Sequence, residues 1–178
     1  VVNEEKIPCW PGPMTVEEYW NGTCNPENLH ISSSWCYGNA GVMRGLQKVA
    51  GYMGWKEKEQ AHVETMIRFF SQNIKTYDLY SPSLCHGFSS LVAIQMCAYS
   101  SYRNPKLLTN LERHIQKMIA GYRKNNENEL NLTDIRNKSI LIEGHLKDLS
   151  ILTGSVGIAI TLLSLKRKTK TGKLLMID

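Results

Sequence analysis

Cys36-Tyr-Gly-Asn-Ala-Gly-Val42, Cys85-His-Gly-Phe-Ser-Ser-Leu91 and Leu152-Thr-Gly-Ser-Val-Gly-Ile158 are three versions of one phrase. Each phrase consists of a turn, a glycine, small residues and then the start of an apolar helix. The phrase recurs after 49 and then 67 residues. A repeat of this length is typical of stacked helix pairs, either in a solenoid or in a closed α/α array.

Between the phrases, hydrophobic residues recur at helical spacing, and almost nothing alternates with the period of two that a strand requires. The sequence therefore predicts an all-α protein whose helical repeats fill residues 31–178. Residues 1–30 are predicted to be irregular, with one short helix where Thr15 and Glu18 form a capping-box pattern. Further helices are predicted after Gly38, over about 56–76, after Gly87, from Asn104-Pro105 onward and after Gly154.

Length and charge limit the possible functions. At 178 residues the chain can form one domain with a substantial core, and its net charge of +5 is dispersed except near Lys166-Arg167-Lys168. No basic stripe interleaved with aromatic residues is visible, so we expect no nucleic-acid partner. The uncharged run from Leu149 to Leu165 is 17 residues long, which is shorter than the roughly 20 residues of a membrane span.

The cysteines are five in number and irregularly spaced, which argues against a disulfide framework and for a reducing, cytoplasmic compartment. We expect Cys97 to lie in the core, and Cys9 and Cys24 to be loop thiols.

Cys36, Cys85 and His86 combine two thiols and an imidazole, and each group is closed by a glycine. Three such ligands with a fourth position left open are typical of catalytic zinc sites. The adjacent pair Cys85-His86 requires a bend in the chain, which Gly87 is expected to permit. The alternative is that each cysteine is a small buried hydrophobic residue.

The same residues carry a resemblance. Trp35-Cys36-Tyr37-Gly38 with Gly41, followed by Cys85-His86-Gly87, resembles the lanthionine synthetase C family, the cyclases that close thioether rings in lantibiotic precursor peptides. The resemblance implies an α/α toroid of two nested helix layers, with the glycine phrases lining one mouth of the barrel. Family members are longer, and this chain resembles their C-terminal half.

The resemblance also implies a chemistry. Zn²⁺ held by Cys36, Cys85 and His86 would bind a peptide cysteine, whose thiolate adds to dehydroalanine or dehydrobutyrine in the same peptide. Tyr37 would orient the substrate or stabilise the enolate, the alternative being a packed aromatic ring. His30 is the histidine nearest to the site in sequence and is our candidate for an acid or base.

Two departures from the family concern catalysis. No residue here matches the motifs of its acid/base histidine and aspartate, which lie in the N-terminal half, and Ile31-Ser32-Ser33-Ser34 stands where members often carry an arginine. We therefore expect low or no turnover from this chain alone. Two alternatives are a zinc- and thiol- or peptide-binding protein of the same fold that makes no rings, and a helical-repeat module with incidental cysteines.

The expected partners follow from the resemblance. They are a dehydrated precursor peptide, a dehydratase and a transporter at the inner face of the membrane, and a second copy of this chain that covers exposed inner surfaces.

Overall fold

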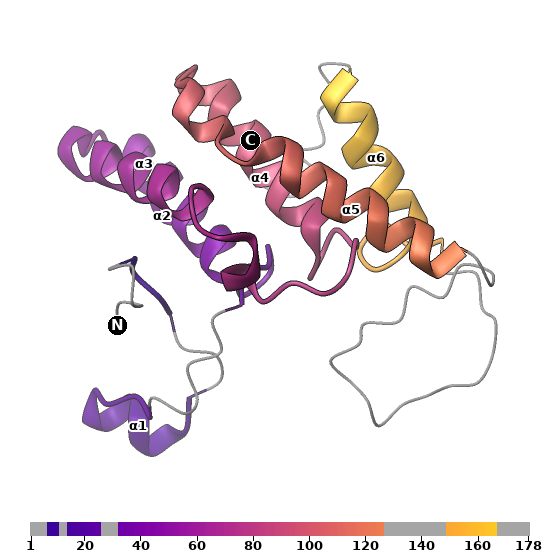
Figure 1. Ribbon diagram of the computed structural model, residues 1–178. Helices are drawn as coiled ribbons and strands as arrows, with labels where there is room; N and C mark the ends of the chain where they lie inside the picture. Colours follow the sequence, from indigo (N-terminus) through magenta and orange to yellow (C-terminus); the bar gives the residue numbers. More distant parts are fainter. Residues whose placement is uncertain (1–6, 11–13, 26–31, 127–148, 167–178) are drawn as a thin grey trace.

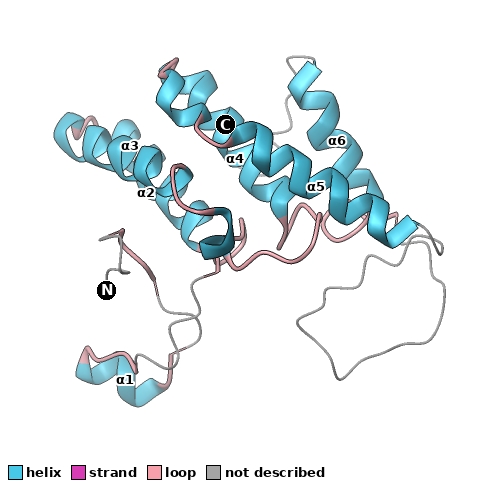
Figure 2. Ribbon diagram, in the orientation of Figure 1, coloured by secondary structure: helices cyan, strands magenta, loops and turns pink. Residues whose placement is uncertain are grey.

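The computed structural model describes residues 7–10, 14–25, 32–126 and 149–166. These ranges contain helices and loops but no strand, which confirms the all-α prediction (Figure 2). The α-helices are α1 (Val16–Asn21), α2 (Asn39–Tyr52), α3 (Lys56–Phe70), α4 (Phe88–Tyr102), α5 (Leu111–Asn126) and α6 (Ser155–Lys166), and the 3₁₀ helices are η2 (Ile74–Tyr77) and η3 (Pro105–Leu108). None of the helices in these ranges is long and apolar enough to cross a membrane.

Helices α2, α4 and α6 form one layer, and α3 and α5 form a second layer outside it (Figure 1). Helix α4 packs between α2 and α6, while α3 pairs with α2 and α5 pairs with α4. The amino-terminal ends of α2, α4 and α6 lie toward the same side of the molecule (Figure 1). Each of the three repeated phrases therefore delivers its loop to that side.

Helix α4 is the centre of the described fold. Every residue from Phe88 to Gln95 is buried, so the helix has no solvent-exposed face along its first two turns. The core around it is completed by the T-shaped ring contacts of Phe69 with Phe70 and with Tyr77, whose hydroxyl donates to the carbonyl of Phe69 at 2.8 Å. The apolar residues at helical spacing in the sequence predict that these helices pack around a common core.

His114 of α5 is fully buried in this core. Its Nδ1 lies 2.9 Å from Oε1 of Gln95, and its ring meets the ring of Tyr77 edge to face. Since the amide nitrogen of Gln95 donates to the carbonyls of Leu107 and Thr109, its oxygen is free to accept from Nδ1–H. Burial lowers the pKa of His114 to about 4, so the ring is neutral.

The amino-terminal segment packs against the helices. Ile7 and Cys9 are buried, and the backbone N–H of Trp10 donates to Oδ1 of Asn39 at 3.0 Å. Cys9 lies in a loop, as predicted, but its thiol is buried, because Ile7 belongs to the core and Trp10 packs against it.

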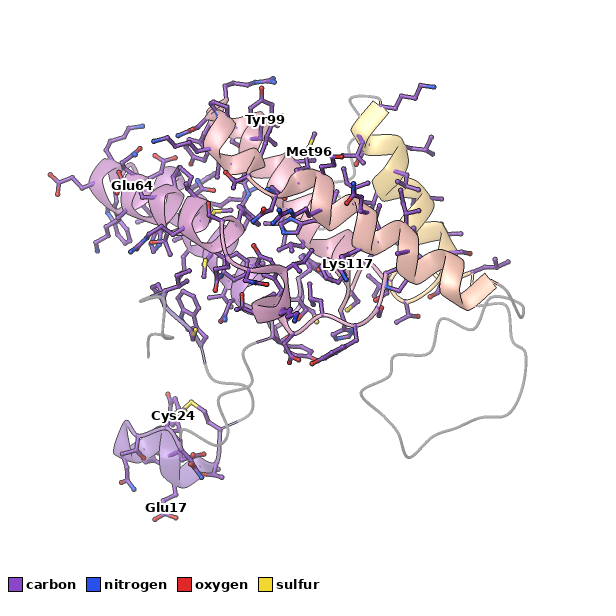
Figure 3. All side chains as sticks on the ribbon, viewed as in Figure 1. Glu17, Cys24, Glu64, Met96, Tyr99 and Lys117 are labelled. Carbon is purple, nitrogen blue, oxygen red and sulfur yellow. The ribbon has the colours of Figure 1, made fainter. Side chains whose placement is uncertain are left out.

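Helix α1 has the predicted capping box, in which Thr15 and Glu18 each accept from the other's backbone N–H. The helix is short, and all of its residues are at least partly exposed. It lies apart from the other helices, together with Cys24 (Figures 1 and 3). Cys24 is therefore not close to the predicted metal ligands.

Two predicted helices have different limits in the structure. The helix predicted over 56–76 ends at Phe70, because the hydroxyl of Ser71 binds the carbonyl of Ile67 and the side chain of Asn73 caps the separate helix η2. The helix predicted from Asn104-Pro105 onward is divided in two, because it begins as the short η3 and continues after Asn110 as α5.

Asn110, at φ 61°, separates η3 from α5. Its Nδ2 donates to the carbonyls of Phe70 and Gln72, each at 3.1 Å, so this break ties the chain to the end of α3.

A polar chain joins α2, α3 and α4. The buried guanidinium of Arg44 donates to Gln47 and to Ser101, the amide of Gln47 donates to the hydroxyl of Tyr102, and that hydroxyl donates to Glu59. Burial and the hydrogen bond to the carboxylate of Glu59 raise the pKa of Tyr102 above its ordinary value. The buried positive charge of Arg44 is thus connected to a carboxylate through two neutral groups.

Candidate metal centre

The structure brings together the three residues predicted as metal ligands. Cys36 lies just before α2, and Cys85 and His86 lie just before α4. The Nε2 atom of His86 is 3.1 Å from Sγ of Cys36 and 3.7 Å from Sγ of Cys85. All three ligand atoms lie within 4.8 Å of one another. Cys36 is exposed, His86 is partly buried and Cys85 is buried, so the group lies at the surface and Cys85 reaches into the interior.

The two separations between sulfur and nitrogen are compatible with a tetrahedral zinc ion. Zn–S bonds of about 2.3 Å and Zn–N bonds of about 2.0 Å place neighbouring ligand atoms about 3.5 to 3.8 Å apart. The two separations between sulfur and nitrogen lie within about half an ångström of this range. Two thiols and one imidazole are also the ligand types that zinc prefers, and a fourth position is left for a substrate atom.

Serine turns precede both ligand groups. In the first loop the hydroxyl of Ser32 accepts from the backbone N–H of Ser34, and in the second the hydroxyl of Ser81 accepts from that of Ser83 at 2.9 Å. The carbonyls of Ser32 and Ser81 then accept from the first N–H groups of α2 and α4, at 2.7 and 2.9 Å. The two loops therefore enter their helices along the same path.

These serines are not among the site residues predicted from the sequence. The signal was available, because Ser-x-Ser-x-Cys occurs before both glycine phrases: Ser32 to Cys36 and Ser81 to Cys85. In the first loop the hydroxyl of Ser34 also lies 3.9 Å from Sγ of Cys36. The repeated unit in these two loops thus begins four residues before the cysteine, at Ser32 and at Ser81.

The glycines after the ligands are needed for space. Gly38 and Gly87 have extended backbones that any residue can adopt, at φ −91° and −130°. A Cβ atom on Gly38 would lie 2.1 Å from the nitrogen of Ser34, and one on Gly87 would lie 2.2 Å from the carbonyl oxygen of Ser81. Gly87 lies at the predicted bend before α4, and its missing Cβ allows the loop to approach the helix this closely.

Backbone hydrogen bonds join the three loops in a row. The N–H of Trp35 donates to the carbonyl of Cys85 at 3.3 Å, and the N–H of Cys85 donates to the carbonyl of Leu152 at 2.8 Å. Cys85 therefore sits between the first loop and the third. Each ligand loop is held by its neighbour as well as by its own helix.

Tyr37 lies beside the centre. Its ring centroid is 5.1 Å from that of His86, and the residue is 50% exposed. A half-exposed phenol next to a candidate ligand can reach a bound substrate, whereas Trp35 packs against the core. The other predicted acid or base, His30, lies outside the described residues.

The remaining cysteines lie elsewhere. Cys97 is partly buried on α4 and packs against the core, as predicted, and none of the five cysteines, all of which are described, forms a disulfide. In the part of the chain that the structure describes, Cys36, Cys85 and His86 form the only cluster that could hold a metal ion.

Two layers of paired helices with a Cys-Cys-His cluster where two of them begin define the class: an α/α repeat protein with a candidate metal centre. Residues 10–176 match the family described as "Lanthionine synthetase C-like protein". The match covers nearly the whole chain, which therefore belongs to the lanthionine synthetase C-like family. A search of curated proteins found no match to this chain.

Proposed function

We propose that this chain binds Zn²⁺ through Cys36, Cys85 and His86 and uses it to add a peptide cysteine to a dehydroalanine or dehydrobutyrine residue, which closes a thioether ring. The observation that carries the proposal is the cluster itself, two sulfurs and Nε2 within 4.8 Å at the start of two neighbouring helices. Membership of the lanthionine synthetase C-like family supports the same reading.

The arrangement of the ligands suits a site that admits a substrate. Cys85 is buried and is held through its N–H and its carbonyl by the two neighbouring loops, so it provides a fixed ligand. Cys36 is exposed, so the group is open to solvent on that side. When bound, zinc would supply an open coordination position and favour the thiolate form of a substrate thiol at neutral pH.

The ring-closing step conserves atoms and electrons. The sulfur forms a bond to the β-carbon, the carbon–carbon π bond breaks, and the proton lost by the thiol is balanced by one gained at the α-carbon. Negative charge develops on the carbonyl oxygen next to that carbon. The hydroxyl of Tyr37 is the group that we assign to donate a hydrogen bond to this oxygen, because its ring lies beside His86 and is half exposed.

The partners are proposals of the same kind. The substrate is a dehydrated precursor peptide, which a dehydratase would supply and a transporter at the membrane would remove. His30 as an acid or base and a second copy of this chain remain predictions from the sequence.

The proposal is tested by following the free cysteine thiol of a substrate peptide, which ring closure consumes. The zinc-loaded chain is mixed with a short peptide that carries one cysteine and one dehydroalanine, and ring closure is followed as protection of the peptide from alkylation. We expect slow protection that exceeds the uncatalysed rate and that is lost in His86→Asn. Tyr37→Phe should keep its zinc and slow the reaction by at least about tenfold.

A different result would point to the alternative. If the chain holds zinc and thiol but never protects the peptide above the uncatalysed rate, the proposed activity is wrong for this chain. The chain would then be a zinc- and thiol-binding protein of the same fold.

A further inference from the structure

The third loop has the same construction as the two ligand loops. The N–H of Thr153 donates to the hydroxyl of Ser150 at 3.2 Å, as the N–H of His86 does to the hydroxyl of Ser83 at 3.4 Å. This loop has no sulfur, because Leu152 stands where the other two loops have Cys36 and Cys85.

The approach of loop to helix is also repeated. A Cβ atom on Gly157 of α6 would lie 1.9 Å from the carbonyl oxygen of Ile151. A Cβ atom on Gly41 of α2 would lie 1.8 Å from the carbonyl oxygen of Trp35. The matching contact shows that loop and helix approach each other in the same way in both places. Leu152 therefore holds the position in the third loop that Cys36 holds in the first.

Leu152 is next to the metal centre. Its carbonyl accepts from the N–H of Cys85 at 2.8 Å, so the two residues lie side by side. Leu152 is 44% exposed, and its neighbours Ile151 and Leu149 are exposed as well. An apolar surface thus borders the ligand cluster on the side of Cys85, and the half-exposed ring of Tyr37 borders it at His86.

We propose that Leu152 determines substrate specificity by contacting an apolar side chain next to the reacting cysteine of the peptide. This inference rests on the proposed function, since it needs a thiol bound at the centre. A thiol held beside Cys85 brings its neighbouring residue over the third loop, where an apolar side chain removes the exposed surface of Leu152 from water. A polar neighbour gains nothing there.

Thiol binding to the cobalt-loaded full chain tests the inference without turnover. Cobalt replaces zinc as the probe, and the absorption of its bond to the thiolate reports binding of two blocked dipeptides, Leu-Cys and Ser-Cys. We expect the chain to prefer Leu-Cys by about fivefold in Kd, from partial burial of two leucine side chains. Leu152→Ala and Leu152→Asn should reduce this preference to less than about twofold without changing the cobalt content.

Leu163→Ala is the matched control, because Leu163 is an exposed leucine on α6 outside the loop. The control should keep the fivefold preference. The inference would be overturned if the parent chain and all three variants showed the same preference for Leu-Cys over Ser-Cys. It would also be overturned if Leu163→Ala lost as much of this preference as the Leu152 variants. Neither result would affect the metal centre. A change from dimer to monomer in Leu152→Asn would show that a second copy covers this surface instead. A chain that binds no metal would overturn the proposed function and this inference with it.

Discussion

The buried residue His114 makes the stability of the folded chain depend on pH. Its pKa is about 4 in the folded chain, against about 6.5 in an unfolded one, because burial disfavours the charged ring. Between these values the unfolded chain binds a proton that the folded chain does not. The contribution of His114 to the free energy of unfolding is therefore fully present above pH 6.5 and is lost as the pH falls toward 4.

We expect lowering the pH from 7 to 5 to reduce the free energy of unfolding by about 2 kcal/mol through His114. Urea unfolding at the two pH values, with a chelator present throughout, measures this change. His114→Gln removes the titrating group and should show a pH dependence that is smaller by that amount. The same pH dependence in both proteins would contradict the assignment.

The residue scale also shows what the sequence could predict of the site. Cys36, Cys85 and His86 were found because each stands in a glycine phrase, and the structure places them together. The burial of His114 could not be read in this way. A histidine on an amphipathic helix has the same pattern whether it faces water or an amide such as Gln95, and only the packed neighbours decide.

At the scale of the elements, α2 contains two glycines with opposite roles. A Cβ atom on Gly41 would lie 1.8 Å from the carbonyl oxygen of Trp35, whereas one on Gly45 would meet nothing within 4 Å. Gly41→Ala must therefore displace the loop that carries Cys36. Gly45→Ala only improves the helix propensity of an exposed position.

We expect Gly41→Ala to lower the free energy of unfolding by at least about 2 kcal/mol, and Gly45→Ala to raise it by about 0.5 to 1 kcal/mol. Chemical denaturation of the two variants beside the parent chain measures both effects. Changes of the same sign and size would mean that the close approach of the first loop to α2 is unimportant.

The helix limits show where sequence patterns fall short. The helical spacing of hydrophobic residues located α2, α3, α4, α5 and α6, because a helix that buries one face or its whole surface carries apolar residues at those positions. It did not locate the end of α3 at Phe70 or the break at Asn110, since both depend on polar side chains that bind specific carbonyls. The serine turns before the ligands differ from these two, because the repeated Ser-x-Ser-x-Cys pattern makes them visible in the sequence.

At the scale of the whole molecule, the polar chain from Arg44 to Glu59 ties three helices together at a distance from the loops. Tyr102 is its central member, because it links Gln47 of α2 to Glu59 of α3. Tyr99, which is labelled in Figure 3, lies one turn earlier on α4 and stacks with Arg103. No hydrogen bond of the Tyr99 hydroxyl is found among the described residues.

Tyr102→Phe should lower the free energy of unfolding by about 1 to 3 kcal/mol, because it leaves Gln47 and Glu59 without this partner. Tyr99→Phe, the matched control, should change it by less than about 0.5 kcal/mol. Thermal or urea unfolding of both variants decides the matter. A loss in the control as large as that in Tyr102→Phe would show that the hydroxyl of Tyr102 has no special role.

The central claim is that two neighbouring loops assemble one zinc site, and zinc stoichiometry of the purified chain tests it most directly. We expect about one zinc per chain, lost in Cys36→Ala and in Cys85→Ala and retained in Cys24→Ala, whose cysteine lies beside α1. Circular dichroism confirms that each protein is folded. A folded parent chain without zinc, or zinc retained in both ligand variants, would contradict the claim.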